Sequence, residues 1–224
     1  MLDWTIVIPV KGTHTAKSRL GASTELAMAI ALDSVAAAVA TARVIVVTAT
    51  TASASFEDLG ARVVKDPSGG LNAAIRAGIA AAGSGGAGGG PVAVLLGDVP
   101  ALQAAELAAA LALAEQHPLA FVPDADGDGT VLITALTAAD HAPAFGAGSR
   151  AAHAAAGYLE LDLPADSGLR RDVDTPEHLT ALASRLGPRT AARYSFESNS
   201  FESNSFESNS FESNSFESGL MALP

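Results

Sequence analysis

Short apolar runs alternate with alanine-rich stretches along most of the chain. Branched and aromatic apolar residues dominate six runs, which we predict to be strands: residues 4–10, 43–48, 62–65, 92–96, 119–122 and 131–134. Alanine dominates three stretches without proline, which we predict to be helices: residues 24–40, 72–82 and 106–115. Because the strands are continuously apolar, both faces of the sheet are buried. The pattern predicts an α/β three-layer sandwich with a mostly parallel sheet.

The C-terminal part of the chain has a different pattern. Residues 195–218 repeat Ser-Phe-Glu-Ser-Asn four times and break off in a fifth copy. A period of five residues matches neither a helix nor a strand, so we expect no packed amphipathic element there. The sequence therefore predicts one domain over residues 1–185 and a low-complexity, disordered tail over residues 186–224, or an expansion of the gene.

Composition narrows the possible classes of protein. The chain of 224 residues has no cysteine, which excludes disulfides, thiolate nucleophiles and cysteine-ligated zinc. Its net charge is −11, of which five charges belong to the repeat, and an acidic surface disfavours nucleic acid and anionic membranes as partners. Its first residues do not resemble a signal peptide, so we expect none, and no apolar run approaches the roughly 20 residues that span a bilayer. We expect a cytoplasmic protein.

Ligands of open parallel sheets bind at the carboxyl ends of the strands. Three cations, Lys11, Lys17 and Arg19, follow the first predicted strand. Lysine and arginine in one loop suit the phosphates of a nucleotide. An ordinary solvated loop is the alternative interpretation.

Three aspartates are candidate metal ligands. Asp98 follows the strand at residues 92–96, while Asp172 and Asp174 are separated by one residue, so that in an extended segment both face the same side. Mg²⁺ prefers carboxylate and phosphate oxygens, so these side chains form a metal set if the fold brings the two segments together. The alternative is helix capping by Thr175 and Pro176, which requires neither aspartate.

Two glycine turns precede predicted helices. Gly146 and Ser149 belong to a turn whose free N–H groups suit a carboxylate or phosphate, although Ser149 also fits a plain N-cap. Asn72 follows the other turn and can contact a base edge. The glycine-rich residues 83–90 lack the Lys-Ser/Thr of a P-loop, so we interpret them as a surface loop. The five histidines show no metal-ligand spacing.

These motifs together resemble the phosphoenolpyruvate or 2-phospho-L-lactate guanylyltransferase family over residues 4–185. The resemblance is carried by Ile8-Pro9-Val10-Lys11, Ala16-Lys17-Ser18-Arg19-Leu20, Asp66 with Gly70-Leu71-Asn72, Gly97-Asp98-Val99-Pro100, Gly146 with Gly148-Ser149-Arg150, and Leu169-Arg170-Arg171-Asp172-Val173-Asp174-Thr175-Pro176. It implies a nucleotidyltransferase (Rossmann-like) fold and the joining of GTP to a small phosphorylated carboxylic acid, with pyrophosphate released. The product would pass to a downstream transferase in the biosynthesis of coenzyme factor 420.

The resemblance also assigns roles to residues. Asp98, Asp172 and Asp174 would hold Mg²⁺, and Lys17, with Lys11 and Arg19, would bind phosphates. Thr130, Gly146 and Ser149 would hold the carboxylate of the acid. Val131 departs from the family pattern, which has a small or hydroxylated residue there.

Two other classes of protein stay open from the residues alone. A glycosyltransferase could use Asp172 and Asp174 as its metal pair, and it would release a nucleoside diphosphate instead of pyrophosphate. A non-catalytic GTP-binding module would bind the nucleotide without turnover. The sequence does not separate phosphoenolpyruvate, 2-phospholactate and 3-phosphoglycerate, because each carries a phosphate near a carboxylate.

Overall fold

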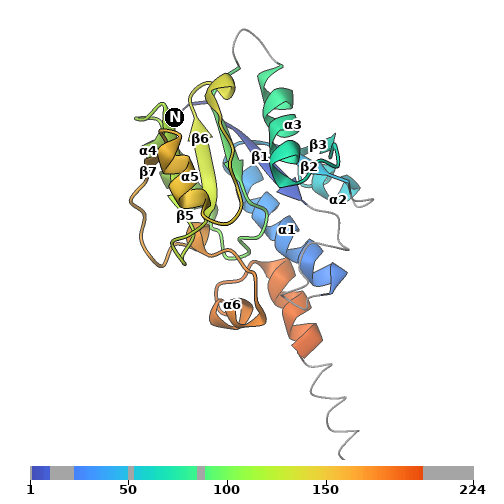
Figure 1. Cartoon of the computed structure of the whole chain (residues 1–224). Coiled ribbons are helices and arrows are strands. Elements are labelled where there is room, and N and C mark those ends of the chain that lie inside the picture. The colour runs from blue at the N-terminus through green and yellow to red at the C-terminus, as the bar shows by residue number, and fades with distance from the viewer. Residues whose placement is uncertain (1, 11–22, 50–52, 85–88, 199–224) are drawn as a thin grey trace, which may run out of the picture.

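The computed structural model describes residues 2–10, 23–49, 53–84 and 89–198. Its centre is a seven-stranded sheet in the order β3-β2-β1-β4-β6-β5-β7 (Figure 1). The strands are β1 (Thr5–Val10), β2 (Arg43–Thr48), β3 (Arg62–Lys65), β4 (Val92–Leu95), β5 (Leu119–Pro123), β6 (Thr130–Ala135) and β7 (Leu159–Glu160). All neighbours are parallel except β6, which is antiparallel to β4 and to β5. The predicted mostly parallel α/β sheet is confirmed.

Helices cover both faces of the sheet (Figure 1). One face packs against α1 (Thr24–Val39) and α4 (Ala104–Ala114), and the other against α3 (Leu71–Gly83) and α5 (Ser149–Ala155). The shorter elements are α2 (Ser53–Glu57), α6 (Pro176–Ala181) and the 3-10 turns η1 (Ala138–Asp140) and η2 (Gly168–Arg170). Successive residues of β1 enter opposite cores, since Ile6 and Ile8 join one cluster and Val7 the other. This is why the strands are continuously apolar in sequence.

Helix α3 lies very close to the sheet at Gly78. A Cβ atom added there would stand 2.3 Å from Val7 Cγ1 and 2.9 Å from Val47 Cγ2. Glycine is unfavourable inside a helix by about 1 kcal/mol relative to alanine. Its presence is explained by this close approach of the helix to β1 and β2.

A helix over residues 188–198 follows α6 and lies beside α1 (Figure 1). The buried carboxylate of Asp33, in α1, accepts hydrogen bonds from the backbone N–H groups of Thr190 (2.7 Å) and Arg189 (3.3 Å). Asp33 thereby caps the N-terminus of the helix over residues 188–198, although Asp33 itself belongs to α1. The fold thus continues beyond the predicted boundary at Arg185 and includes the start of the first repeat copy. The remaining tail, residues 199–224, lies outside the described residues, and its separation from the domain stays a prediction.

A third apolar cluster joins this C-terminal part to the domain. It contains Leu26 and Ile30 of α1, Ala101, Val173, and Leu179 and Leu182 of the α6 region. Tyr194 of the C-terminal helix packs against it. In the part of the chain that the structure describes, no helix is long and apolar enough to cross a bilayer.

Replacing Gly78 with alanine should destabilise the protein despite the better helix propensity of alanine. The added methyl group overlaps Val7 and Val47, and overpacking of this kind costs about 1–3 kcal/mol. Thermal unfolding monitored by circular dichroism measures the effect. Gly83→Ala is the matched control, because its Cβ would meet Ala138 at an ordinary 3.6 Å. A Gly78→Ala variant as stable as the wild type would contradict the close packing.

Truncation tests where the folded unit ends. A chain that stops at residue 198 should unfold at the temperature of the full chain, whereas one that stops at Arg185 should unfold several degrees lower. The shorter chain leaves the buried Asp33 carboxylate without its backbone donors, and an unsatisfied buried group costs about 1–3 kcal/mol or more. Equal unfolding temperatures for both truncated chains would place the boundary at Arg185 after all.

Candidate active site

The candidate site lies at the edge of the sheet where β1, β4 and β5 end. Gly97 and Asp98 follow β4, and Asp124 follows β5. Because β6 is antiparallel to these strands, its first residue, Thr130, belongs to the same edge. The predicted phosphate-binding cations Lys11, Lys17 and Arg19 lie outside the described residues.

The backbone joins the two predicted aspartate segments. Val173 N–H donates a hydrogen bond to the carbonyl oxygen of Asp98 at 2.9 Å. The Val173 side chain is fully buried in the third apolar cluster. The buried Val173 side chain thus anchors this segment to the domain, and Asp172 and Asp174 are its neighbours in sequence. The fold therefore brings the two segments together, as the metal hypothesis requires.

A second anchor holds the chain just before Asp172. The N–H of Gly168 donates to the Glu106 carboxylate of α4 at 3.0 Å. A Cβ at Gly168 would stand 2.2 Å from the carbonyl oxygen of Ala101, so only glycine fits. The guanidinium of Arg170 reaches the carbonyl oxygens of Pro123 (3.3 Å) and Asp124 (3.1 Å) at the end of β5. These contacts fix the aspartate segment between the ends of β4 and β5.

Asp172 has a strongly perturbed carboxyl group. Burial, followed by the negative charges of Asp98, Asp174 and Asp124 in that order, raises its pKa to about 7. A carboxylate crowded by three others is stabilised by a cation, which is the environment expected around a divalent metal. Among the described residues, however, no three acidic or histidine side chains already stand in metal-binding geometry. The metal assignment of Asp98, Asp172 and Asp174 therefore stays a prediction.

Asp124 organises the loop that leads to Thr130. Its carboxylate accepts the backbone N–H groups of Gly127 (2.6 Å), Asp128 (3.2 Å) and Gly129 (2.7 Å). A Cβ at Gly129 would fall 2.1 Å from Asp124 Oδ2, so this wrapping requires a glycine there. The aspartate and glycine residues of the loop are thus explained by its local structure. The loop links the acidic cluster to the start of β6.

The three residues predicted to hold a carboxylate belong to one neighbourhood. Thr130 and Ser149 are almost fully buried, with 3% and 2% of their surface exposed. Thr130 Oγ1 lies 3.0 Å from Nδ1 of His153, which is one helical turn after Ser149 in α5. Gly146 has φ = 137°, a backbone conformation that other residues rarely adopt. The loop of Asp124 joins this group too, because Asp128 accepts the N–H of Gly148 at 3.0 Å.

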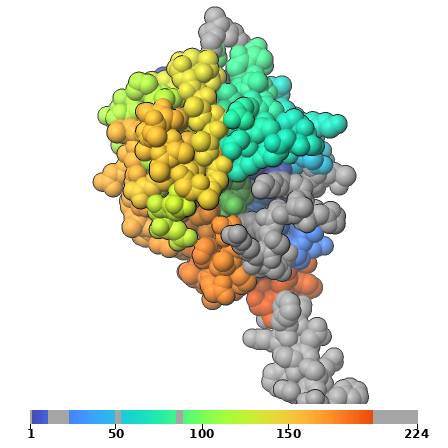
Figure 2. Space-filling view, viewed as in Figure 1, coloured from blue at the N-terminus to red at the C-terminus, as the bar shows by residue number. Residues whose placement is uncertain are grey.

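Asn72, which the sequence suggested as a contact for a base, is engaged with the backbone. Its Nδ2 donates to the carbonyl oxygen of Phe145, and its Oδ1 accepts the N–H of Phe145, both at 3.0 Å. This pair of hydrogen bonds ties α3 to the glycine turn before α5. The two segments adjoin on the face shown in Figure 2, where α3 is teal and the turn is yellow. Asn72 therefore shapes the turn that carries Gly146.

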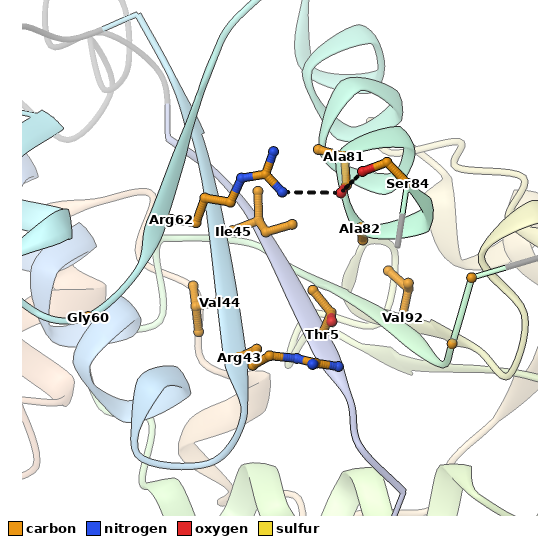
Figure 3. A pocket seen from close by; sticks show the side chains of 12 residues that line it. Thr5, Arg43, Val44, Ile45, Gly60, Arg62, Ala81, Ala82, Ser84 and Val92 are labelled. Carbon is orange, nitrogen blue, oxygen red and sulfur yellow. Dashed lines mark hydrogen bonds between the residues drawn. The ribbon is translucent and has the colours of Figure 1, made fainter. Parts of the chain in front are cut away.

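A separate cavity of about 750 Å³ lies at the opposite edge of the sheet (Figure 3). The first residues of β1, β2 and β4 line it, together with Arg62 and the end of α3. Arg62 donates to the carbonyl oxygen of Ala81 at 3.3 Å. Among the described residues, its walls carry no carboxylate and none of the predicted site residues lines it. We therefore identify the site from the carboxyl edge of the sheet and not from this cavity.

Sequence reasoning missed the hydrogen bonding of two histidines, His153 beside Thr130 and His141 at the opposite end of β4. His153 contacts Thr130, and His141 bonds to the hydroxyl of Tyr158 (3.1 Å) and to the carbonyl oxygen of Val92 (3.0 Å). A search for metal-ligand spacing could not find them, because each pairs with hydroxyl and backbone groups. The available signal was the spacing of four residues between Ser149 and His153 on an alanine-rich helix.

Comparisons with known proteins agree with this geometry. The model of the MobA-like NTP transferase domain matches residues 18–171. The phosphoenolpyruvate guanylyltransferase of Streptomyces coelicolor is 49% identical over 203 residues, which cover 85% of this chain and 95% of that protein. Its counterpart in Streptomyces avermitilis is 46% identical over 203 residues, or 85% of this chain and 94% of the relative.

A solved structure shares the fold at low sequence identity. A nucleotidyl transferase from Methanothermobacter superposes with a TM-score of 0.54 at 21% identity, covering 80% of this chain and 95% of that one. Rv0371c of Mycobacterium tuberculosis, solved in complex with manganese, gives 0.52 at 20% identity, with 80% and 97% covered. These two structures show the fold alone. The family of the chain is shown by the matched domain model and by the sequence identities of 49% and 46% to the Streptomyces proteins. The chain belongs to the phosphoenolpyruvate guanylyltransferase family, and it is a nucleotidyltransferase.

Proposed function

We propose that this protein transfers GMP from GTP to the phosphate of phosphoenolpyruvate and releases pyrophosphate. One observation carries the proposal: a crowded set of carboxylates and a pair of buried hydroxyl residues share one edge of the sheet, linked by the Asp124 loop. The carboxylates suit a metal-bound nucleotide, and the hydroxyls suit the carboxylate of a small acid. The choice of guanine and of phosphoenolpyruvate over 2-phospho-L-lactate follows the names of the relatives.

The reaction is an in-line displacement at the α-phosphorus of GTP. A phosphate oxygen of the acid forms the new bond to this phosphorus, and the bond to the bridging oxygen of the β-phosphate breaks. Mg²⁺ bound by Asp98, Asp172 and Asp174 would neutralise charge on the reacting phosphates. Lys11, Lys17 and Arg19 bind the phosphates of GTP in this proposal. Catalysis is positioning and charge neutralisation, because the attacking oxygen is already an anion.

The neutral side of the site binds the acid. Thr130 and Ser149 offer hydroxyl donors and the turn at Gly146 offers backbone N–H groups to the carboxylate of the acid. Asn72 acts on this subsite indirectly, through Phe145. The product, an activated diester, passes to a downstream transferase in the formation of coenzyme factor 420. GTP is a cytoplasmic nucleotide, so we place the enzyme in the cytoplasm.

Purified protein with GTP and Mg²⁺ should release pyrophosphate when phosphoenolpyruvate is added, and less or none with 2-phospho-L-lactate. A coupled pyrophosphate assay measures turnover. A parallel reaction contains the downstream transferase and its deazaflavin acceptor, which removes a labile or tightly bound product. Absence of pyrophosphate in both reactions, from protein with a native circular dichroism spectrum, would refute the proposal. Release of GDP instead would indicate a glycosyltransferase.

Asp172→Asn should lower turnover by about 100-fold or more, because the metal loses a charged ligand. The same change should raise thermal stability when no divalent metal is present. In the wild type the folded-state pKa of about 7 exceeds the ordinary aspartate pKa of 3.8, so ionisation of Asp172 opposes folding as the pH rises. The stability gain of the variant should therefore grow between about pH 4 and 7 and stay constant above that range.

Differential scanning calorimetry in EDTA at several pH values tests this dependence. Asp162→Asn is the control for loss of one negative charge, because Asp162 is exposed. It should alter neither turnover nor the pH dependence of stability. Normal turnover of Asp172→Asn would remove Asp172 from the metal set, and a stability gain independent of pH would refute the crowding of carboxylates.

A further inference from the structure

His153 is fully buried and surrounded by aromatic rings. The centroid of its imidazole lies 5.0 Å from that of Phe145 and 5.4 Å from that of Tyr158, both in edge-on arrangements, and 6.3 Å from that of Phe121. Such packing fixes the plane of the ring. Both ring nitrogens also have polar partners, and these partners determine which nitrogen carries the hydrogen.

The partners determine which nitrogen carries the proton. The backbone N–H of Ala144 can only donate, and it points at Nε2 at 3.0 Å, so Nε2 is the acceptor. Burial, and after it the nearby His141, lowers the pKa of His153 to about 4, although a hydrogen bond to the backbone of Ser149 opposes both. At neutral pH the ring is therefore uncharged, and its one N–H is on Nδ1, 3.0 Å from Thr130 Oγ1.

The orientation of the Thr130 hydroxyl follows from this tautomer. Oγ1 accepts the Nδ1–H of His153, so the hydroxyl hydrogen of Thr130 does not point at the ring and is available for another acceptor. A hydroxyl held in this way is a preset donor. It suits an anionic oxygen, such as that of a carboxylate, better than it suits a donor.

The same ring supports the other parts of the proposed acid subsite. Ala144, which donates to Nε2, lies two residues before Gly146, and Ser149 lies one helical turn before His153. The three segments that carry Thr130, Gly146 and Ser149 therefore meet at one imidazole.

We propose that His153 is the positioning residue of the acid subsite, where it presents the Thr130 hydroxyl as a donor to the substrate carboxylate and holds the turn at Gly146. This inference rests on the proposed function. This role acts through Thr130 and the turn at Gly146, so loss of His153 should weaken use of the acid while use of GTP is retained.

His153→Phe keeps a flat ring in the aromatic cage and removes both hydrogen bonds. We expect the KM for phosphoenolpyruvate to rise about 10- to 100-fold, as for a lost hydrogen bond to a charged group, and the KM for GTP to change less than about twofold. His153→Asn places an amide donor near the position of Nδ1, so it should recover part of the loss. Steady-state kinetics with each substrate varied in turn measures this split.

His141→Phe is the matched control. It also removes two hydrogen bonds of a histidine, to Tyr158 and Val92, but His141 is only partly buried and does not contact Thr130. It should lower the unfolding temperature and leave the KM for phosphoenolpyruvate within about twofold. Equal effects of the two phenylalanine variants on this KM, or equal rises in both KM values for His153→Phe, would reduce His153 to a structural role.

A measurement on the wild-type protein separates this inference from the proposed reaction. Nitrogen-15 NMR of the histidine rings should show His153 as the Nδ1–H tautomer, uncharged at about pH 6, with its signals shifted by added phosphoenolpyruvate. This requires no turnover and no variant that folds. An Nε2–H tautomer, a charged ring, or signals unmoved by the acid would overturn the role of His153. A shifted Nδ1–H signal without pyrophosphate release would support the subsite and refute only the reaction.

Discussion

Strand β4 lies between a parallel neighbour, β1, and an antiparallel one, β6. The directions of these strands determine which end of each strand lies at the edge of the sheet that carries the candidate site. The parallel strands deliver the residues that follow them, Asp98 and Asp124, whereas the reversed strand delivers its first residue, Thr130. A fully parallel sheet would place Thr130 at the opposite edge, near the cavity of Figure 3.

The two sides of the active edge follow different physical rules. On one side, carboxylates are gathered at a cost in free energy, because burial and then mutual repulsion oppose their ionisation and raise the pKa of Asp172. The burial of Val173 and the backbone bond to Asp98 offset it. On the other side, hydroxyl, imidazole and amide groups are joined by hydrogen bonds of 3.0 Å. The crowded carboxylates thus stand where a metal and phosphates would compensate their charge.

Much of this arrangement can be predicted from the sequence. The continuous apolar runs give the buried parallel strands, and Asp172-Val173-Asp174 displays its alternation of polar and buried residues directly. The reversed direction of β6 could not be predicted, because a fully buried strand has the same pattern in either direction. The C-terminal helix was missed because its cap, Asp33, is more than 150 residues away in sequence. The role of Asn72 depends on a contact with Phe145, which is 73 residues away in sequence.

The position of Asp124 also has a consequence for how this enzyme family could diversify. In the proposed site, the first half of the chain and the aspartate segment form the nucleotide side, whereas β6, the turn at Gly146 and α5 form most of the acid side. Among the described residues, the loop wrapped around Asp124 links the two sides. Changes in a stretch of about thirty consecutive residues could therefore exchange one small phosphorylated acid for another, with the machinery for GTP inherited intact. Selectivity for the acceptor acid could in this way change independently of nucleotide binding.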